Sequence, residues 1–304
     1  MATQQRVGVI GLGAMGMGMA QSLRRAGHLV NVFDVRIEVA HKFAAKGGVA
    51  CSSLEEIAKN SDVLVSVVVN AAQTESVLFG DGSAHSACAH HLKSGSVFVM
   101  CSTVDPAFSV GLEKKLNDKG LLYIDAPISG GAAKAAAGQM TMMTAGSPAA
   151  YEKAEVFLNA MAGKVYKLGG SAGAGSKVKI INQLLAGVHI AAAAEAMALG
   201  LREGVDAEAL YEVITHSAGN SWMFENRMAH VLAADYTPLS AVDIFVKDLG
   251  LVLDMARATK FPLPLSSTAH QMFMQASTAG FAKEDDSAVI KIFPGIELPK
   301  GKSN

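Results

Sequence analysis

Residues 63–69 read Val-Leu-Val-Ser-Val-Val-Val, a run that is apolar at almost every position. Such a run favours a strand buried on both faces, which belongs inside a parallel sheet covered by helices. Similar runs recur along this part of the chain, at 6–10, 29–33, 63–68, 97–100, 122–124, 140–145 and 165–167. Helix-like segments alternate with them, at 15–25, 37–46, 54–59, 107–118 and 149–161. This alternation predicts an α/β fold with a doubly wound parallel sheet.

The organisation changes near residue 170, where three glycines fall within residues 169–173. After this linker the β signal disappears, and residues 174–203 read as one helix of about 30 residues, roughly 45 Å long. Further helices are expected at 207–215, 222–233, 241–258, 265–279 and 287–292. The sequence therefore predicts two domains: 1–168 with the sheet, and 169–304, all-α and beginning with a long inter-domain helix.

The composition excludes several classes of protein. The 304 residues are 50% hydrophobic and 17% charged, which is typical of a globular chain with a large core. The net charge of −1 gives no basic surface for nucleic acid or an anionic membrane. Cys51, Cys88 and Cys101 form no CxxC pair, which favours a reducing compartment. The apolar segment 184–201 carries His189 and Glu195 and is interpreted as a buried helix, so we expect a cytoplasmic protein.

A glycine motif follows the first predicted strand and opens the first helix. It has the GxGxxG pattern and consists of Gly11, Leu12, Gly13, Ala14, Met15 and Gly16. The first glycine allows a tight turn, the second lets the backbone approach a pyrophosphate, and the third permits close packing of helix and strand. The helix N-terminus then offers N–H groups to the anion. This context predicts a Rossmann-type domain that binds a dinucleotide.

Asp34 lies at the end of the next strand, 23 residues after Gly11. A carboxylate at this place accepts hydrogen bonds from both ribose hydroxyls of NAD and repels the 2′-phosphate of NADP. Arg36 is close enough in sequence to favour NADP instead. Because Asp34 stands directly at the strand end, NAD is the expected cofactor.

Motifs at separate places in the chain point to one family. Besides residues 11–16 there are Ser102-Thr103, Asp-Ala-Pro-Ile-Ser-Gly-Gly at 125–131, Gly-Ala-Gly-Ser-Lys-Val-Lys-Ile-Ile-Asn at 173–182 and Phe-Val-Lys-Asp-Leu at 245–249. Together they resemble the β-hydroxyacid dehydrogenase family, related to 3-hydroxyisobutyrate dehydrogenase, over residues 5–293. Residues 216–227, 240–248 and 283–288 resemble one subgroup, and this implies oxidation of L-threonate at C2 to a 2-oxo acid with formation of NADH.

The resemblance implies that Lys179 is the general acid–base. Hydride transfer from an alcohol requires a protein group that takes the hydroxyl proton, and an ordinary lysine needs a lowered pKa to do so. Desolvation and the nearby ammonium of Lys247 are two possible causes. Asn182 and Gln183 follow Lys179 by three and four residues, on the same helical face. Family members use amides here to bind substrate and orient the lysine. The usual Asn-Asn pair is Asn-Gln in this chain, which leaves the two roles open.

Other family positions fall on loops. The backbone of Ser129, Gly130 and Gly131 is expected to receive the substrate carboxylate, since exposed N–H groups bind anions. Thr103, at the carboxyl edge of the sheet, is expected to contact the nicotinamide.

The family also contacts cofactor through a Leu-Pro pair, which is Val68-Val69 here, so that the backbone contact is kept without the rigid proline. Lys247 matches a family lysine that meets nicotinamide and substrate, and Asp248 is expected to pair with it and to lie near the substrate.

Alternatives remain at this point. The substrate could be another hydroxy acid, such as D-threonate, D-erythronate, 3-hydroxyisobutyrate or glycerate, or the chain could be a catalytically silent dinucleotide-binding module. A homodimer or homotetramer is usual in the family. A metal site is not expected, although His85, Cys88, His90 and His91 cluster in the sequence.

Overall fold

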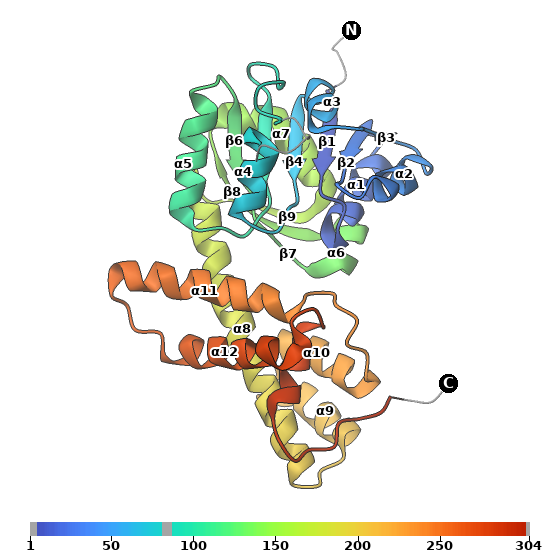
Figure 1. The fold of residues 1–304 in the computed structure, drawn as a ribbon, viewed down its shortest axis with the longest axis vertical. Helices are drawn as coiled ribbons and strands as arrows, with labels where there is room; N and C mark the ends of the chain where they lie inside the picture. Colours follow the sequence, from blue (N-terminus) through green and yellow to red (C-terminus); the bar gives the residue numbers. More distant parts are fainter. Residues whose placement is uncertain (1–4, 81–86, 302–304) are drawn as a thin grey trace. The chain divides into compact units, whose positions relative to one another are not determined.

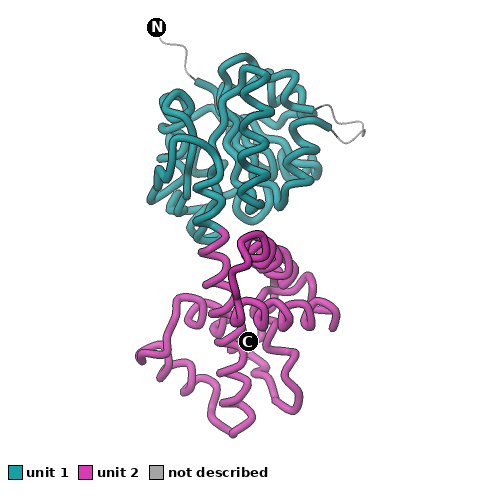
Figure 2. Tube along the Cα trace, turned by 90° about the vertical axis from the view of Figure 1, so that its left-hand side faces the viewer, with its two compact units in different colours: residues 1–179 teal, residues 180–304 magenta. Residues whose placement is uncertain are grey.

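The computed structural model describes residues 5–80 and 87–301, which form two compact units, 1–179 and 180–304 (Figure 2). Unit 1 contains the sheet (Figure 1). Its strands are β1 (Val7–Ile10), β2 (Val30–Phe33), β3 (Val49–Ala50), β4 (Val63–Ser66), β5 (Val97–Met100), β6 (Leu122–Asp125), β7 (Ile128–Ser129), β8 (Met140–Gly146) and β9 (Ala162–Lys167). Their order is β3-β2-β1-β4-β5-β6-β8-β7, and β9 pairs with β8.

The sheet is parallel from β3 to β6, as the sequence predicts. At the β8 edge the sheet becomes mixed, since β8 runs antiparallel to both β6 and β7. Pro127 has no N–H to donate, and it separates β6 from β7. Beyond β7 the chain turns through α6 (Gly131–Ala137) and returns along the same two strands as β8. This hairpin-like return reverses the strand direction.

Helices cover both faces of this sheet, which confirms the doubly wound architecture (Figure 1). One face packs against α1 (Ala14–Arg25) and α7 (Pro148–Met161), the other against α3 (Leu54–Lys59), α4 (Ala71–Phe79) and α5 (Pro106–Asn117), while α2 (Ile37–Ala44) precedes β3. Within β5 the side chains alternate: Val97 and Val99 join the first core, Phe98 and Met100 the second. A strand with two apolar faces therefore holds two cores together.

Helices α1 and α6 pack unusually closely. A Cβ atom added at Gly18 of α1 would lie 2.5 Å from the backbone nitrogen of Ala136 in α6. Next to it, the hydroxyl of Ser22 donates a hydrogen bond to the carbonyl of Ala135 at 3.0 Å. Any side chain at Gly18 would force these helices apart, since protein interiors have no free volume to absorb it.

Unit 2 is helical, as predicted (Figure 1). The helix α8 (Ala174–Arg202) enters it, followed by α9 (Ala207–Thr215), α10 (Trp222–Ala233), α11 (Val242–Thr259) and α12 (Pro264–Ala276), with a π-helical turn at Ser277–Phe281 and a 3₁₀ segment at Asp286–Ile292. By length and composition alone α8 could cross a membrane. Its residues Ile190, Ala194 and Met197 are instead buried in the core of unit 2, together with Phe245 and Phe273, whose rings stack at 5.1 Å. The helix thus behaves as a core helix.

Candidate active site

The glycine loop joins β1 to α1 at the point where the strand order reverses. β1 lies between β2 and β4, so the chain leaves β1 to one side and later returns on the other. Doubly wound sheets bind their ligands at the carboxyl ends of the strands at this place.

Steric contacts require glycine at two of the loop's three glycine positions, and the third faces open space. Gly11 has a φ of +86°, and a Cβ there would lie 2.8 Å from the carbonyl oxygen of Val67. A Cβ at Gly16 would lie 1.8 Å from the carbonyl oxygen of Gly11. At Gly13, by contrast, an added Cβ would meet no described atom within 4 Å. Gly13 is also the N-cap of α1 and has no side chain to cap it. The helix N-terminus therefore opens onto space suited to a pyrophosphate, and a nicotinamide dinucleotide fits these residues.

Asp34 ties this loop to β2. Its carboxylate accepts hydrogen bonds from the backbone N–H of Leu12 at 2.7 Å and from that of Arg36 at 2.9 Å. The Arg36 side chain lies 3.3 Å from the same carboxylate. Burial alone would raise the pKa of Asp34, but these hydrogen bonds from Arg36 and Leu12 outweigh it and hold the pKa below its ordinary value. The carboxylate is thus charged and pre-positioned beside the loop.

Val68, Val69 and Thr103 follow β4 and β5 at the same edge of the sheet. Ser102 donates its hydroxyl to the carbonyl of Val68 at 2.8 Å, and the N–H of Val69 donates to the side-chain oxygen of Gln73 at 2.8 Å. A proline at position 69 could not make the second bond. In this chain a hydrogen bond to α4 therefore restrains the loop where the family pattern has a proline.

The loop of Ser129, Gly130 and Gly131 leads from β7 into α6. Gly130 has a φ of +134° and Gly131 a φ of +74°, values that favour glycine. An added Cβ at Gly131 meets no described atom within 4 Å, so the backbone there is open to a small ligand.

Asp125 anchors the start of α8 inside unit 1. Its carboxylate accepts from the backbone N–H of Gly173 and of Ser176, both at 2.9 Å, and from the Ser176 hydroxyl at 2.7 Å. A Cβ at Gly175 would lie only 2.3 Å from the carbonyl oxygen of Met143, so the helix start touches β8 directly. Burial raises the pKa of Asp125, although the hydrogen bonds from Ser176 and Gly173 act in the opposite direction. The sequence motif contained Asp125, but this anchoring role was not predicted.

Lys179 lies one turn beyond this anchor and is only 7% exposed. A lysine is rarely buried so deeply unless its ammonium is paired or used. Its backbone is therefore fixed by the Asp125 contacts, and its side chain is largely withdrawn from water.

In unit 2, Asn182, Gln183, Lys247 and Asp248 form one hydrogen-bonded chain. The Lys247 ammonium lies 2.5 Å from one oxygen of Asp248, and the Gln183 amide donates to the other oxygen at 2.6 Å. The Asn182 amide donates to the side-chain oxygen of Gln183 at 3.0 Å. Asp248 is 2% exposed. The structure confirms the expected pairing of Lys247 with Asp248, and it joins this pair to Asn182 and Gln183.

The three cysteine thiols lie in buried positions that disfavour their reaction. Cys51, Cys88 and Cys101 are free and buried, and burial raises the pKa of Cys51 and of Cys101 to about 12. In the ranges 5–80 and 87–301, no three His, Cys, Asp or Glu side chains are arranged to hold a metal ion. His85, named in the sequence as part of a cluster, lies outside the described residues.

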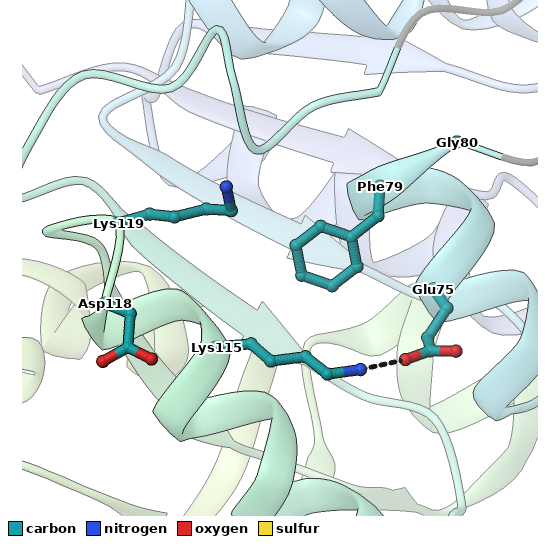
Figure 3. A pocket seen from close by; sticks show the side chains of 6 residues that line it. All are labelled: Glu75, Phe79, Gly80, Lys115, Asp118 and Lys119. Carbon is teal, nitrogen blue, oxygen red and sulfur yellow. Dashed lines mark hydrogen bonds and ion pairs between the residues drawn. The ribbon is translucent and has the colours of Figure 1, made fainter.

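Figure 3 shows a hollow in unit 1 that is separate from the glycine loop; its lining consists of Glu75, Phe79, Gly80, Lys115, Asp118 and Lys119. It lies at the C-terminal ends of α4 and α5, which face the amino edge of the parallel strands. Lys115 is already paired with Glu75 at 2.6 Å. This hollow therefore does not belong to the candidate site.

Comparisons with known proteins agree with this geometry. Residues 6–170 match a family model described as the NAD binding domain of 6-phosphogluconate dehydrogenase. Residues 173–293 match one described as "NAD-binding of NADP-dependent 3-hydroxyisobutyrate dehydrogenase".

Individual relatives span nearly the whole chain. The sequence is 66% identical over 295 residues to L-threonate dehydrogenase of Cupriavidus necator, covering 97% of this chain and 98% of that protein. It is 53% identical to L-threonate dehydrogenase of Escherichia coli K12, covering 98% of this chain and 97% of that protein. A crystal structure from Salmonella typhimurium, described as 3-hydroxyisobutyrate dehydrogenase, has 53% identity and a TM-score of 0.90, covering 95% of this chain and 100% of that one. The chain therefore belongs to the 3-hydroxyisobutyrate dehydrogenase-related family of β-hydroxyacid dehydrogenases, and it is an oxidoreductase that uses a nicotinamide dinucleotide to convert a hydroxy acid.

Proposed function

We propose that the protein oxidises L-threonate at C2 to the 2-oxo acid, with NAD as the acceptor and Lys179 as the general acid–base. One observation carries the catalytic part: Lys179 is 7% exposed and stands just after a helix start that Asp125 holds through three hydrogen bonds. The substrate rests on similarity, because two relatives at 66% and 53% identity are named L-threonate dehydrogenases.

The reaction divides between cofactor and protein. A nicotinamide dinucleotide held by the glycine loop and Asp34 would supply the acceptor for the hydride of C2, which carries two electrons and one hydrogen away from the substrate. The hydroxyl proton of C2 passes to the Nζ atom of Lys179, so that the C2–O bond becomes a carbonyl. In the reverse direction the Lys179 ammonium returns this proton to the carbonyl oxygen.

The substrate carboxylate is assigned to the loop of Ser129, Gly130 and Gly131, where the two glycines present their backbone N–H groups. The support is the left-handed backbone at both glycines and the open space beside Gly131. Asn182 and Gln183 bind and orient the substrate, Asp248 supports them, and Lys247 is assigned to the nicotinamide side. Thr103, Val68 and Val69 complete the cofactor contacts at the carboxyl edge of the sheet.

NAD is proposed over NADP because of Asp34. Its carboxylate is charged and already fixed by Leu12 and Arg36, so it accepts ribose hydroxyls and repels a 2′-phosphate. The Arg36 side chain is 58% exposed and bonded to Asp34, which leaves the carboxylate as the dominant group.

Self-association is proposed as well, in the form of a homodimer or homotetramer. The helix α8 exposes Ile181, Leu185 and Leu199, with 53%, 52% and 63% of their surfaces accessible. Apolar residues spaced four and fourteen apart recur on one face of a helix and are suited to a second copy of this chain.

In this scheme residues 1–168 hold the cofactor in a cytoplasmic enzyme, and residues 169–304 serve substrate and assembly.

One experiment tests the assignment most directly. Purified protein is assayed with NAD and with NADP against a panel of hydroxy acids of three to six carbons, including L-threonate, D-threonate, D-erythronate, 3-hydroxyisobutyrate and glycerate. L-Threonate with NAD is expected to give the highest kcat/KM. A preference for 3-hydroxyisobutyrate would contradict the substrate and leave the family intact. NAD binding without turnover of any acid would favour a silent dinucleotide-binding module.

A further inference from the structure

The hydrogen bonds between Asn182, Gln183, Asp248 and Lys247 have a fixed direction. Asp248 is buried and paired with the Lys247 ammonium at 2.5 Å, and a carboxylate in such a pair only accepts hydrogen bonds. Gln183 must therefore turn its NH₂ group toward Asp248, as the bond of 2.6 Å requires. The side-chain oxygen of Gln183 then points away from Asp248 and accepts a hydrogen bond from the Asn182 NH₂ group at 3.0 Å.

This direction also determines the orientation of Asn182. If the Gln183 amide were flipped, its oxygen would face the Asp248 carboxylate and its NH₂ would face the Asn182 NH₂, so both contacts would be repulsive. With Gln183 locked, Asn182 gives its NH₂ to Gln183. The carbonyl oxygen Oδ1 of this half-buried residue is the end of the amide that is left for a ligand.

We propose that Gln183 is a positioning residue that makes Asn182 a hydrogen-bond acceptor for a substrate hydroxyl, one other than the hydroxyl being oxidised. This inference rests on the proposed function, since it assumes that Asn182 faces the substrate. The inference also specifies the chemical class of the substrate. The site selects polyhydroxy acids, and it disfavours acids that carry an alkyl group in place of the hydroxyl that contacts Asn182. A site built to bond a hydroxyl rejects the analogue without it, because its own polar group is then left unpaired.

The test compares L-threonate with 2-hydroxybutyrate, which has the same four-carbon backbone and the C2 hydroxyl but lacks the hydroxyls at C3 and C4. Gln183→Met keeps the side-chain length and removes the hydrogen bonds to Asp248 and to Asn182. Gln183→Asn keeps an amide that is one methylene shorter, and it serves if the first variant does not fold. The control is Glu195→Gln, an exposed position on the same helix.

The wild-type protein is expected to prefer L-threonate strongly. In both Gln183 variants the ratio of the two kcat/KM values should fall at least about tenfold, mainly through KM for L-threonate, because Asn182 is no longer held as an acceptor. The control should keep the wild-type ratio, and the Tm is recorded for each protein.

Equal losses for both acids, with the ratio unchanged, would show a merely structural role for Gln183 and overturn the inference. A wild-type enzyme that prefers 2-hydroxybutyrate would overturn it as well. Failure of the proposed function looks different: L-threonate would be inactive while another hydroxy acid is oxidised, and the same ratio is then measured with that acid and its deoxy counterpart.

Discussion

Replacing Asp125 by alanine should loosen the start of α8 and with it Lys179. The change leaves three buried donors without their acceptor: the N–H groups of Gly173 and Ser176 and the Ser176 hydroxyl. Each unsatisfied donor costs about 1–3 kcal/mol. This cost is partly offset. Burial raises the pKa of Asp125, which shows that desolvation of its carboxylate is unfavourable, and the variant has no buried carboxylate.

We therefore expect a loss of about 2–4 kcal/mol in the free energy of unfolding, less than the three donors alone would give. For a chain of this size that corresponds to a fall in Tm of roughly 4–16 °C. Urea unfolding followed by circular dichroism measures the first quantity and calorimetry the second. The kcat for L-threonate should fall as well, since the backbone that carries Lys179 is no longer fixed.

The matched control is Ser176→Ala, which removes only the hydroxyl bond at 2.7 Å. It should cost about 1 kcal/mol and leave both backbone bonds in place. If Asp125→Ala were no less stable than Ser176→Ala, or if it kept the wild-type kcat, Asp125 would not be the anchor that the geometry indicates.

Three further predictions concern the base, the cofactor and acid stability. Lys179→Ala should lower kcat at least about a hundredfold with little change in NAD affinity. The control is Lys177→Ala, at an exposed neighbouring position, and its kcat should stay within a few-fold of the wild-type value. The reverse result would mean that the wrong lysine was assigned. If Asp34 selects the cofactor, kcat/KM should favour NAD over NADP by at least roughly tenfold, and equal values would refute this role. Burial alone would raise the pKa of Asp285, but hydrogen bonds from His230 and Ser287 outweigh it and lower the pKa to about 2. A carboxyl group whose pKa is lowered by folding stabilises the folded protein at pH values above its ordinary pKa of 3.8. This stabilisation is lost as the pH falls toward 2. Asp285→Asn should therefore unfold in urea with a shallower pH dependence between pH 4 and 2, and an unchanged slope would contradict the assignment.

The sequence predicted the long elements of the fold and the positions of the loops. The strands at β1, β4 and β5 were evident because consecutive apolar residues allow few other structures. The two-residue strands β3 and β7 were missed, since two residues carry no periodicity. Helices α4 and α6 were missed too: α6 is a short, alanine-rich segment that packs against α1, and α4 shows little separation of apolar and polar faces.

The site could be named from motifs but not assembled from them. Gln183 and Asp248 lie 65 positions apart, and the hydrogen bond between them follows from how α8 and α11 pack. A Cβ at Gly187 would lie 2.9 Å from Leu249, so this approach depends on a glycine that belongs to no recognised motif. Asp125 stood inside a motif, yet its partners are Gly173, the last residue of the linker, and Ser176, in the helix that follows. Spacing along the chain does not report such contacts.

The close packing at Gly18 has a consequence for how the two anionic ligands are held. The helix α1 begins at the glycine loop proposed for the pyrophosphate, and α6 begins at the loop proposed for the substrate carboxylate. Contact at Gly18 and the bond from Ser22 to Ala135 join these helices into one stiff piece. The positions of the two loops therefore depend on the same contact between α1 and α6. A larger residue at Gly18 would push α1 and α6 apart and so displace both loops at once, and the binding of cofactor and of substrate would be expected to weaken together.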